Sequence, residues 1–408
     1  MPENAANGWT SEQIIAMDKA YVMGTYGRAP VAFVRGEGMY LWTAEGERFL
    51  DMVSGGRAGC GLGHCHPKVT RAIQEQAETL AFVSNDYYCP TRAELARRLS
   101  ERTHGYKVFF TNSGTEATEG ALKLARKWSK KAKGPEAVEI LTAYQSFHGR
   151  SYGAMSATGQ AKFQEGFEPI LPGFRYMRFL DRQTIVQKMP DETCAVMLET
   201  IQGESGVNPV TKEYIQDVRK LTEEKNILLI MDEVQCGFGR TGRFWCYEHF
   251  DIQPDIVTLA KSLGGGLSVG VVLARPDVAE AFGPGTHGST FGGNPLGTAA
   301  ALAAMNTLEE ENLIQNAADM GDYFRRGLAT LKRNGRPIQL TRGLGLMIGV
   351  QLTAPIAAQV AMRCLEMGLL IHNVGDSVLR ILPAMVAKAE HIDEALGILD
   401  KSLAISNP

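Results

Sequence analysis

The chain has 408 residues, of which 44% are hydrophobic and 21% are charged, a balance typical of a globular protein long enough for more than one domain. Its formal net charge of −3 excludes the basic footprint of a nucleic-acid-binding protein and the polybasic surface of a membrane-bound one. Scattered cysteines, 7 in all, short apolar runs and a start (Met1 to Asn4) without a signal-peptide pattern lead us to expect a cytoplasmic protein.

The patterns of apolar residues, taken in chain order, predict an α/β protein. Residues 12–25 predict an N-terminal helix, and residues 31–51 predict small hairpin strands. From about 66 to 305, helical patterns alternate with strand-like runs at 108–111, 139–141, 195–199, 227–231, 256–260 and 269–273. That alternation is typical of a mostly parallel sheet flanked by helices. We therefore predict a large cofactor domain over residues 66–305.

Beyond residue 306 the pattern changes to a helix, short strands near 345–352 and 378–382, and a closing helix over about 387–403. We expect both ends of the chain, residues 1–65 and 306–408, to combine into a smaller α+β domain. The predicted fold is thus a large, mostly parallel sheet with flanking helices, plus a second, smaller domain.

Two apolar runs each end in an ionisable residue. Asp232 closes the run that starts at Leu228, and Lys261 follows the run that starts at Ile256 and precedes three glycines. Ligands of such sheets bind in the crevice outside the carboxyl ends of the strands, so we expect both side chains in one crevice. A buried lysine beside a carboxylate suits pyridoxal phosphate, whose aldehyde needs an amine and whose pyridine nitrogen needs an acid. Backbone-bonded Asp232 and an outward-pointing Lys261 are the structural alternatives.

A phosphate-binding turn is the second candidate feature. Ser113, Gly114 and Thr115 follow a predicted strand and open an amphipathic helix, and Ser113 with Glu116 has the spacing of a capping box. Free N–H groups at such a helix start would bind a phosphate, although a merely well-capped helix is an equal alternative. Further on, residues 144–150 follow the next strand, where an aromatic side chain could lie on a planar cofactor and Arg150 could bind a carboxylate.

Eight segments in order carry a resemblance to the class III (ornithine/acetylornithine-type) pyridoxal-phosphate aminotransferases of fold type I, from Tyr26 to Pro383. They are 62–67 (LGHCHP), 112–126, 147–150 (FHGR), 199–204 (ETIQGE), 232–242 (DEVQCGFGRTG), 260–261 (AK), 287–295 (HGSTFGGNP) and 379–383 (LRILP). Within that family the chain is most similar to the acetylornithine branch, notably at 83–85 (VSN), 158–160 (TGQ) and 342–347 (RGLGLM).

The resemblance implies how pyridoxal 5′-phosphate would be held. Lys261 would bind the cofactor covalently and, once released, move the proton during catalysis. Asp232 would pair with the pyridine nitrogen, Gln235 would bond the ring oxygen, and Phe147 would stack on the ring. The phosphate would be bound by Ser113, Gly114 and Thr115 of the same chain. Thr290 of the neighbouring subunit of a homodimer would complete the phosphate site.

The resemblance also implies a set of substrate contacts. Arg150 would hold the α-carboxylate of the substrate, and Arg380 would take the distal carboxylate of 2-oxoglutarate or glutamate. Glu204 would act as a switch that pairs with Arg380 when the substrate brings no distal acid, because a buried, unpaired arginine is costly.

The segment between Asp51 and His64 departs from the family pattern. It is one residue longer and carries Arg57 where relatives have an apolar stretch, so Arg57 is either an additional anion anchor or a side chain in solvent. Thr118 also replaces the usual asparagine of the 115–119 motif. We interpret the His64-Cys65-His66 cluster as a structural turn before Pro67 and predict no metal.

These features together predict an aminotransferase that moves the ω-amine of N-acetylornithine, or of a related acylated diamino acid, to 2-oxoglutarate by a ping-pong exchange through pyridoxamine phosphate. The alternatives are another ω-amine or carboxylated donor, and an aminomutase or racemase of the same fold. A cofactor-free binding protein of this fold is an alternative from another class, and a purified protein that stays colourless with added pyridoxal phosphate would favour it.

Overall fold

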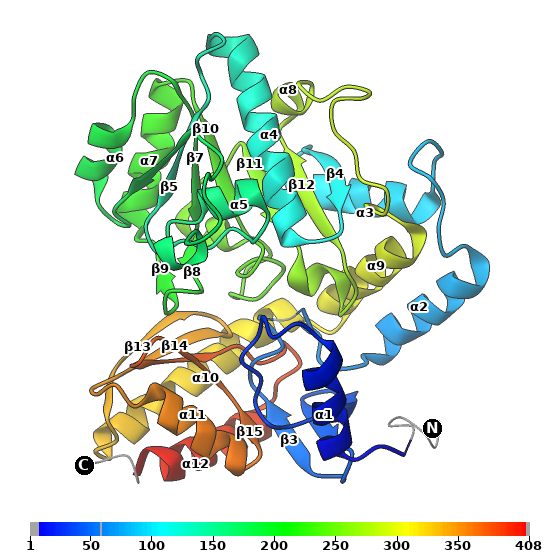
Figure 1. Ribbon diagram of the computed structural model, residues 1–408, viewed down its shortest axis with the longest axis vertical. Helices are drawn as coiled ribbons and strands as arrows, with labels where there is room; N and C mark the ends of the chain where they lie inside the picture. Colours follow the sequence, from blue (N-terminus) through cyan, green and yellow to red (C-terminus); the bar gives the residue numbers. More distant parts are fainter. Residues whose placement is uncertain (1–7, 58, 405–408) are drawn as a thin grey trace.

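The computed structural model describes residues 8–57 and 59–404. Residues Met1 to Asn4, and Ala58 in the unusual 52–61 segment, lie outside the described residues. Figure 1 shows a large unit built on a seven-stranded sheet and a smaller unit built on two four-stranded sheets. The predicted α/β fold is confirmed.

The seven-stranded sheet forms the centre of the large unit. Its strand order is β4 (Lys107–Thr111), β12 (Gly270–Ala274), β11 (Ile256–Leu259), β10 (Leu228–Asp232), β7 (Thr193–Glu199), β5 (Glu139–Ala143) and β6 (Phe174–Met177). Only β12 runs antiparallel to its neighbours. The carboxyl ends of the other six strands therefore lie at one edge of the sheet, where parallel sheets bind their ligands.

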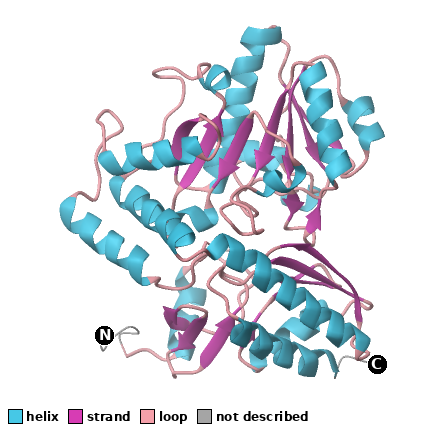
Figure 2. Ribbon diagram, turned by 180° about the vertical axis from the view of Figure 1, so that it is seen from behind, coloured by secondary structure: helices cyan, strands magenta, loops and turns pink. Residues whose placement is uncertain are grey.

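Helices cover both faces of this sheet (Figure 2), which explains why the middle strands are mostly apolar. Every residue of β7, β10, β11 and β12 is buried, as expected for strands without a solvent-facing side. The helices of the large unit are α4 (Gly114–Lys133), α5 (Tyr152–Ala157), α6 (Arg182–Lys188), α7 (Lys212–Glu224) and α8 (Pro276–Ala279).

The smaller unit joins the two ends of the chain. Strand β15 (Leu369–Leu370) pairs in parallel with β3 (Arg48–Asp51), next to β2 (Tyr40–Thr43) and β1 (Phe33–Glu37). The other sheet has the order β13 (Ile338–Leu344), β14 (Met347–Leu352), β17 (Val378–Ile381) and β16 (His372–Val374). Its helices include α1 (Ser11–Tyr21), α10 (Leu313–Arg333), α11 (Ala357–Glu366) and α12 (Ala389–Ala404).

Helices α2 (Pro67–Thr79), α3 (Pro90–Glu101) and α9 (Pro295–Glu310) lie at the side and base of the large unit. Helix α9 runs through residue 305 without a break, and the division at 1–65, 66–305 and 306–408 stays a prediction. The sequence did not predict β6, the edge strand. No helix of the described chain is long and apolar enough to cross a membrane.

Candidate active site

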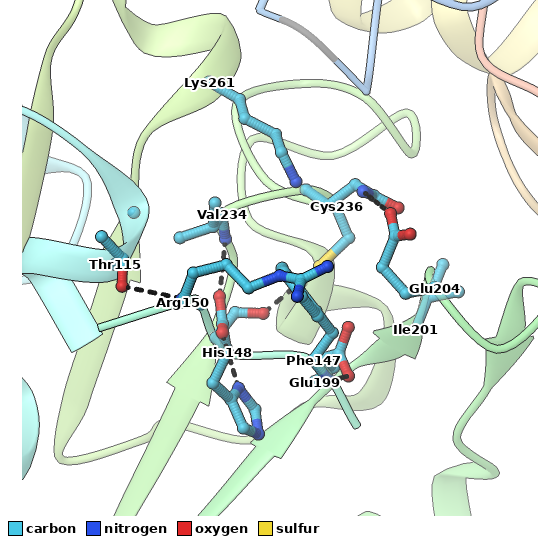
Figure 3. A pocket seen from close by; sticks show the side chains of 14 residues that line it. Thr115, Phe147, His148, Arg150, Glu199, Ile201, Glu204, Val234, Cys236 and Lys261 are labelled. Carbon is cyan, nitrogen blue, oxygen red and sulfur yellow. Dashed lines mark hydrogen bonds and ion pairs between the residues drawn. The ribbon is translucent and has the colours of Figure 1, made fainter. Parts of the chain in front are cut away.

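The segments at the ends of five strands surround one pocket. Asn112 and Ser113 follow β4, Phe147 lies just beyond β5, and Lys261 lies just beyond β11. Two carboxylates, Glu199 and Asp232, end β7 and β10. The pocket between them has a volume of about 250 Å³, at the small end of ligand pockets. Figure 3 shows its lining, which contains most of the predicted site residues: Gly114, Thr115, Phe147, Arg150, Glu204, Asp232, Gln235 and Lys261.

The amino end of α4 forms one wall of this pocket. The Ser113 hydroxyl caps the helix by accepting a hydrogen bond from the N–H of Glu116, as the capping-box spacing predicted. A Cβ at Gly114 would lie 2.7 Å from Val234 Cγ1, so glycine is needed for the helix to approach this closely. The first N–H groups of a helix lack intrahelical acceptors and favour a bound anion. This wall is therefore suited to a phosphate.

The Thr115 hydroxyl fixes the loop opposite this helix end. It accepts hydrogen bonds from the N–H groups of Arg150 and Ser151, at 3.2 and 3.1 Å. A Cβ at Gly149 would lie 2.4 Å from Thr115 Oγ1. The loop that carries Phe147 and Arg150 is thereby held against the amino end of α4.

Asp232 is buried and paired. Its Oδ2 lies 2.7 Å from Nδ1 of His148, and its Oδ1 accepts hydrogen bonds from the N–H of Val234 and the hydroxyl of Thr258. Burial would lower the pKa of His148, but the hydrogen bond to Asp232 outweighs it and raises that pKa. These contacts fix the carboxylate among the residues that line the pocket, where it would pair with a protonated pyridine nitrogen.

Glu199 is a second buried carboxylate beside Asp232. The two residues are direct partners in the register of β7 and β10, and Glu199 accepts hydrogen bonds from the N–H groups of Phe147 and Gly203. Burial raises its pKa to about 7, with the charge of Asp232 adding to the rise. Glu199 thus positions the Phe147 loop and titrates near neutral pH.

Lys261 begins the short 3-10 helix η3 (Lys261–Gly264) with φ of 42°. An L-residue in this left-handed region is strained, and such strain gathers at functional sites. Burial lowers the pKa of Lys261, while the charges of Glu204 and Asp232 oppose the shift. A lysine with a depressed pKa is a better nucleophile near neutral pH. In Figure 3 the Lys261 side chain points into the pocket.

Glu204, which lines the pocket, forms an ion pair with Arg380. Arg380 Nη1 lies 2.6 Å from Glu204 Oε1 and also donates to the carbonyl of Gly203. Arg380 is fully buried. Burial alone would raise the pKa of Glu204, but the neighbouring charge of Arg380 outweighs burial and lowers that pKa to about 2. The Gln235 amide nitrogen lies 3.5 Å from the same carboxylate oxygen. The two predicted site residues Gln235 and Glu204 are therefore neighbours in the structure.

Phe147 and Arg150 also line the pocket. The Phe147 ring makes an edge contact with Phe163 at 5.5 Å between centroids. The Arg150 guanidinium lies over the Phe163 ring at 4.1 Å, which holds a cation at the pocket mouth through a cation–π contact. Arg150 is exposed and makes no ion pair within the described chain.

Four predicted site residues lie outside this lining: Ser113, which caps α4, Arg380, which pairs with Glu204, Thr290 and Arg57. Thr290 is exposed on the loop before α9, away from the pocket of its own chain. Arg57 is exposed but lies near the ion pair, because Arg380 and Glu204 both act on its pKa, which burial lowers first. His64, from the discounted His-Cys-His cluster, is bonded to Asp51 at 2.8 Å.

Sequence reasoning missed several residues of the site. His148 was noted only as part of a motif, and Glu199 only as the end of an apolar run, although that run ends in a carboxylate as the one before Asp232 does. Arg240 is fully buried and donates to the carbonyls of Gly55 and Pro383. Nothing in the sequence signalled that contact.

Residues that fit a pyridoxal-phosphate cofactor thus surround one pocket: a nucleophilic lysine, a buried carboxylate, an aromatic ring and a glycine-lined helix start. The fold and the site define a fold type I, pyridoxal-phosphate-dependent transferase.

Comparison with known proteins agrees. A family model described as aminotransferase class-III matches residues 22–403. The chain is 47% identical to the acetylornithine aminotransferase of Caldanaerobacter subterraneus subsp. tengcongensis, over 96% of this chain and 99% of that one.

Solved structures are similar as well. An ornithine aminotransferase of Toxoplasma gondii, reported with partial occupancy of PLP at its active site, is 34% identical with a TM-score of 0.92, over 97% of this chain and 94% of that one. An acetylornithine aminotransferase of Elizabethkingia anophelis is 31% identical with a TM-score of 0.87, over 97% and 100%. The chain belongs to the class-III aminotransferases, and it is a pyridoxal-phosphate-dependent transaminase with an amine donor and a 2-oxo acid acceptor.

Proposed function

We propose that the enzyme transfers the ω-amino group of N-acetylornithine, or of a closely related N-acylated diamino acid, to 2-oxoglutarate and so forms glutamate. The observation that carries this proposal is the Arg380–Glu204 ion pair, with 2.6 Å between Nη1 and Oε1. Its carboxylate partner, Glu204, lines the pocket that holds Lys261. The name of the relative from Caldanaerobacter supports the choice of donor.

The ion pair suits an enzyme that must accept two unlike substrates in turn. A buried arginine without a counter-charge is strongly unfavourable, so a substrate lacking a carboxylate at that point needs a protein carboxylate in its place. Glu204 supplies one, and it remains about a quarter exposed in its side chain while Arg380 is fully buried. The more accessible partner can swing away when a substrate carboxylate arrives.

The position of the pair suggests which carboxylate Arg380 binds. The charges of Glu204, Asp232, Arg380 and Glu199 all act on the pKa of Lys261, and Arg380 bonds Glu204, which lines the same pocket as Lys261. We therefore propose that Arg380 binds the carboxylate next to the oxo group of 2-oxoglutarate, in place of the distal carboxylate that we expected from the sequence. Arg150, over the Phe163 ring, would then bind the far carboxylate of either substrate, including the α-carboxylate of the donor.

The catalytic roles follow from the chemistry of each side chain. When bound, the cofactor supplies an electron sink for the bond that breaks at the substrate carbon. Lys261 would bind the cofactor and move the proton at that carbon, since its lowered pKa leaves a neutral amine available as a base. Asp232 would keep the pyridine nitrogen protonated, and Phe147 and Gln235 would hold the ring in place.

The phosphate would be bound by Ser113, Gly114 and Thr115 at the amino end of α4, where the helix dipole favours an anion. We propose a homodimer in which Thr290 of each chain completes the phosphate site of the other. Large apolar side chains are exposed near Thr290: Phe82, Tyr87, Tyr88 and Phe291. Phe82 and Phe291 contact each other at 5.3 Å. Such an exposed apolar cluster favours a protein interface.

The cytoplasmic location also stays a prediction.

Single-turnover reactions test this function. The purified enzyme, loaded with pyridoxal phosphate, is mixed with a panel of amines that includes N-acetylornithine, ornithine and carboxylated ω-amines, and the colour of the cofactor is followed. We expect N-acetylornithine to bleach the visible band fastest and 2-oxoglutarate to restore it. Another donor reacting fastest would replace the proposed one, and retention of the amine without any need for a 2-oxo acid would indicate an aminomutase or racemase.

Lys261 provides a separate test. Borohydride should erase the visible band and attach the cofactor irreversibly to Lys261, as mapped by mass spectrometry. The Lys261→Ala variant should bind the cofactor but lose transamination. An adduct on a different lysine, or normal turnover by the variant, would refute the assigned role.

A further inference from the structure

The outer face of helix α4 carries positive side chains that the active site does not use. Four of them follow one another at spacings of three and four residues: Lys123, Arg126, Lys127 and Lys130. Side chains at these spacings are neighbours on the helix surface, and like charges placed so destabilise a helix. The arrangement is therefore unfavourable unless a negative charge lies beside it.

These cations line a groove at the surface of the large unit. The groove has a volume of about 580 Å³, within the range of small-molecule sites. Its other walls come from the start of β5, the turn before β6 and the loop after α8, namely Val138, Glu139, Pro172, Gly173, Phe282 and Thr286. It shares no lining residue with the pocket of Lys261. In Figure 1 the carboxyl end of α4 lies at the end of the large unit far from the smaller unit.

The protein does not neutralise these cations. Among the described residues that line the groove, only Glu139 carries a carboxylate, and Arg175 already pairs with it at 3.1 Å. Glu119, one turn before Lys123, instead accepts hydrogen bonds from backbone N–H groups at the start of α5. Within residues 8–57 and 59–404, none of the four cations forms an ion pair with a carboxylate. The groove therefore holds an excess of positive charge.

The dipole of α4 accounts for only part of this charge. Cations in the last turn of a helix are stabilised by its dipole, which explains Lys130 and the nearby Lys131 and Lys133. The effect falls off within one turn, and Lys123 and Lys127 lie before the last turn. Their positions require another explanation.

Two of the cations are held in place by uncharged partners. Arg126 donates from Nε to the carbonyl of Val138 and from Nη2 to the carbonyl of Pro172, which fixes the guanidinium without cancelling its charge. Lys123 Nζ lies 2.8 Å from Nδ1 of His287. Burial lowers the pKa of His287, and the charge of Lys123 lowers it further. The ring is therefore neutral near pH 7 and accepts a hydrogen bond from the ammonium group.

The spacing of the cations favours an extended anion. A helix rises about 1.5 Å per residue, so about 10 Å separates Lys123 from Lys130 along the axis. A single phosphate contacts only neighbouring cations, whereas a chain of phosphates can contact all four. Lysine binds phosphate as a point charge and arginine binds it through a planar fork of donors.

We propose that the groove along α4 binds a small ligand that carries a chain of two or more phosphates, either inorganic polyphosphate or the phosphate end of a nucleotide. Lys123, Lys127 and Lys130 contact the phosphates, and Arg126 supplies a fixed charge beside them. Phe282, half-buried in the groove wall, offers an apolar surface for the remainder of a nucleotide. The site is independent of the amine donor and the 2-oxo acid.

Calorimetric titration of the loaded enzyme with inorganic tripolyphosphate tests the site. The cofactor occupies the phosphate-binding wall at the amino end of α4, so the loaded enzyme reports on the groove. We expect saturable binding of a single ion per chain that weakens as salt is added. The ion should also raise the melting temperature, because it binds only the folded state. Orthophosphate should bind at least about tenfold more weakly than tripolyphosphate.

Two double variants identify the residues that bind. Lys127→Gln with Lys130→Gln should weaken tripolyphosphate binding by about tenfold or more, because two contacts to charged groups are lost. Lys127→Arg with Lys130→Arg should keep most of the affinity. The matched control is Lys388→Gln with Lys401→Gln, which removes the same charge at exposed positions of the smaller unit and should change binding less than about twofold. Transamination without tripolyphosphate should be unchanged in all three, which verifies their folding.

ATP, titrated in the same way, distinguishes the two sources of a phosphate chain. Tighter binding of ATP than of tripolyphosphate would assign the site to a nucleotide, and equal or weaker binding would assign it to the phosphate chain alone. The site is overturned if the unaltered enzyme shows no saturable binding of either ion, or if the glutamine variant at Lys127 and Lys130 binds as the unaltered enzyme does. An equal loss in the control variant would also overturn it, because it would indicate attraction by net charge alone.

Discussion

His148 Nδ1 lies 2.7 Å from Oδ2 of Asp232, and both side chains are buried. Thr258 and the N–H of Val234 bond the other carboxylate oxygen, so protein groups fix the orientation of Asp232 completely. The second ring nitrogen of His148 is buried and has no partner within the described chain. The pair therefore prepares the carboxylate before any cofactor arrives, which lowers the cost of ordering it on binding.

His148→Asn should weaken catalysis more than it weakens folding. Without the imidazole, Asp232 loses its charged neighbour and turns more freely, and outer-shell partners of this kind typically contribute 10- to 100-fold. We expect kcat to fall by roughly that factor and cofactor affinity to fall several-fold, as measured by steady-state kinetics and by absorbance titration. His249→Asn, whose ring nitrogen contacts a backbone carbonyl, serves as the control. An unchanged kcat in a folded His148→Asn enzyme would show that Asp232 needs no such support.

The Glu204→Gln variant should bind the 2-oxo acid acceptor more tightly and react less efficiently with the amine donor. The pKa of Glu204 is held near 2, so the carboxylate is charged at every working pH and its loss leaves Arg380 buried without a counter-charge. We expect the KM for 2-oxoglutarate to fall several-fold, because no protein carboxylate competes with the substrate. The kcat/KM for the ω-amine donor should fall about tenfold or more.

Measuring both half-reactions separates these effects. Glu94→Gln, which removes an exposed carboxylate paired with Arg97 on α3, is a matched control and should change neither constant. A Glu204→Gln enzyme that loses donor and acceptor equally would argue against the switch.

Asp232 and Lys261 could be predicted because the signal is local. Each follows an apolar run whose residues are all buried in the structure, and the topology of a parallel sheet brings such strand ends together. Glu199 carries the same signal at the end of β7 and could have been found by the same reasoning. The helix start at Ser113 could likewise be predicted from the local spacing of Ser113 and Glu116.

The substrate side of the pocket could not be predicted in the same way. His372 faces Arg380 only through the register of β16 and β17, and Arg240 reaches Gly55 across 185 positions of sequence. Contacts of that kind depend on how distant segments pack. Arg57 was left open between an anion anchor and a solvent-exposed residue. Its side chain is exposed, its charge acts on the pKa of His372, and its role stays a prediction.

Arg240→Lys should disturb substrate binding through the backbone. The guanidinium joins the carbonyls of Gly55 and Pro383, which belong to the loop of Arg57 and to the segment just after Arg380. A lysine keeps the charge but cannot make both bonds from one planar group. We expect a several-fold rise in KM for 2-oxoglutarate at nearly constant kcat, measured by steady-state kinetics.

A second variant, compared with Arg240→Lys, distinguishes a role of Arg240 in positioning the substrate-binding loop from a general contribution to stability. Arg240→Met removes the charge and both bonds, and burial already depresses the pKa of Arg240 to about 9, so this variant should fold with less penalty than a broken ion pair would cause. Both variants should show the KM effect. A fall in melting temperature without any change in KM would contradict the positioning role.

The His64–Asp51 pair should make the folded enzyme less stable as the pH rises into the alkaline range. Burial lowers the pKa of His64, but its hydrogen bonds to Asp51 and Cys60 outweigh burial and raise the pKa from 6.5 to about 9. A group whose folded pKa exceeds its unfolded pKa stabilises the fold fully below the unfolded value, and that contribution is lost as the pH rises through the folded value. The loss should therefore fall between about pH 6.5 and 9, and it amounts to roughly 3 kcal/mol at most.

Melting temperatures measured from pH 6 to 10 check this expectation. The unaltered enzyme should lose stability across that window, whereas His64→Asn should be less stable at pH 6 and show a flatter profile, with His104→Asn as the exposed control. Asp51 also accepts hydrogen bonds from the N–H groups of Val53 and Ser54, at the start of the loop that carries Arg57. Because the pair anchors that loop, the KM for 2-oxoglutarate in the unaltered enzyme should rise over the same pH range. Parallel profiles for the two proteins would place the alkaline transition elsewhere in the molecule.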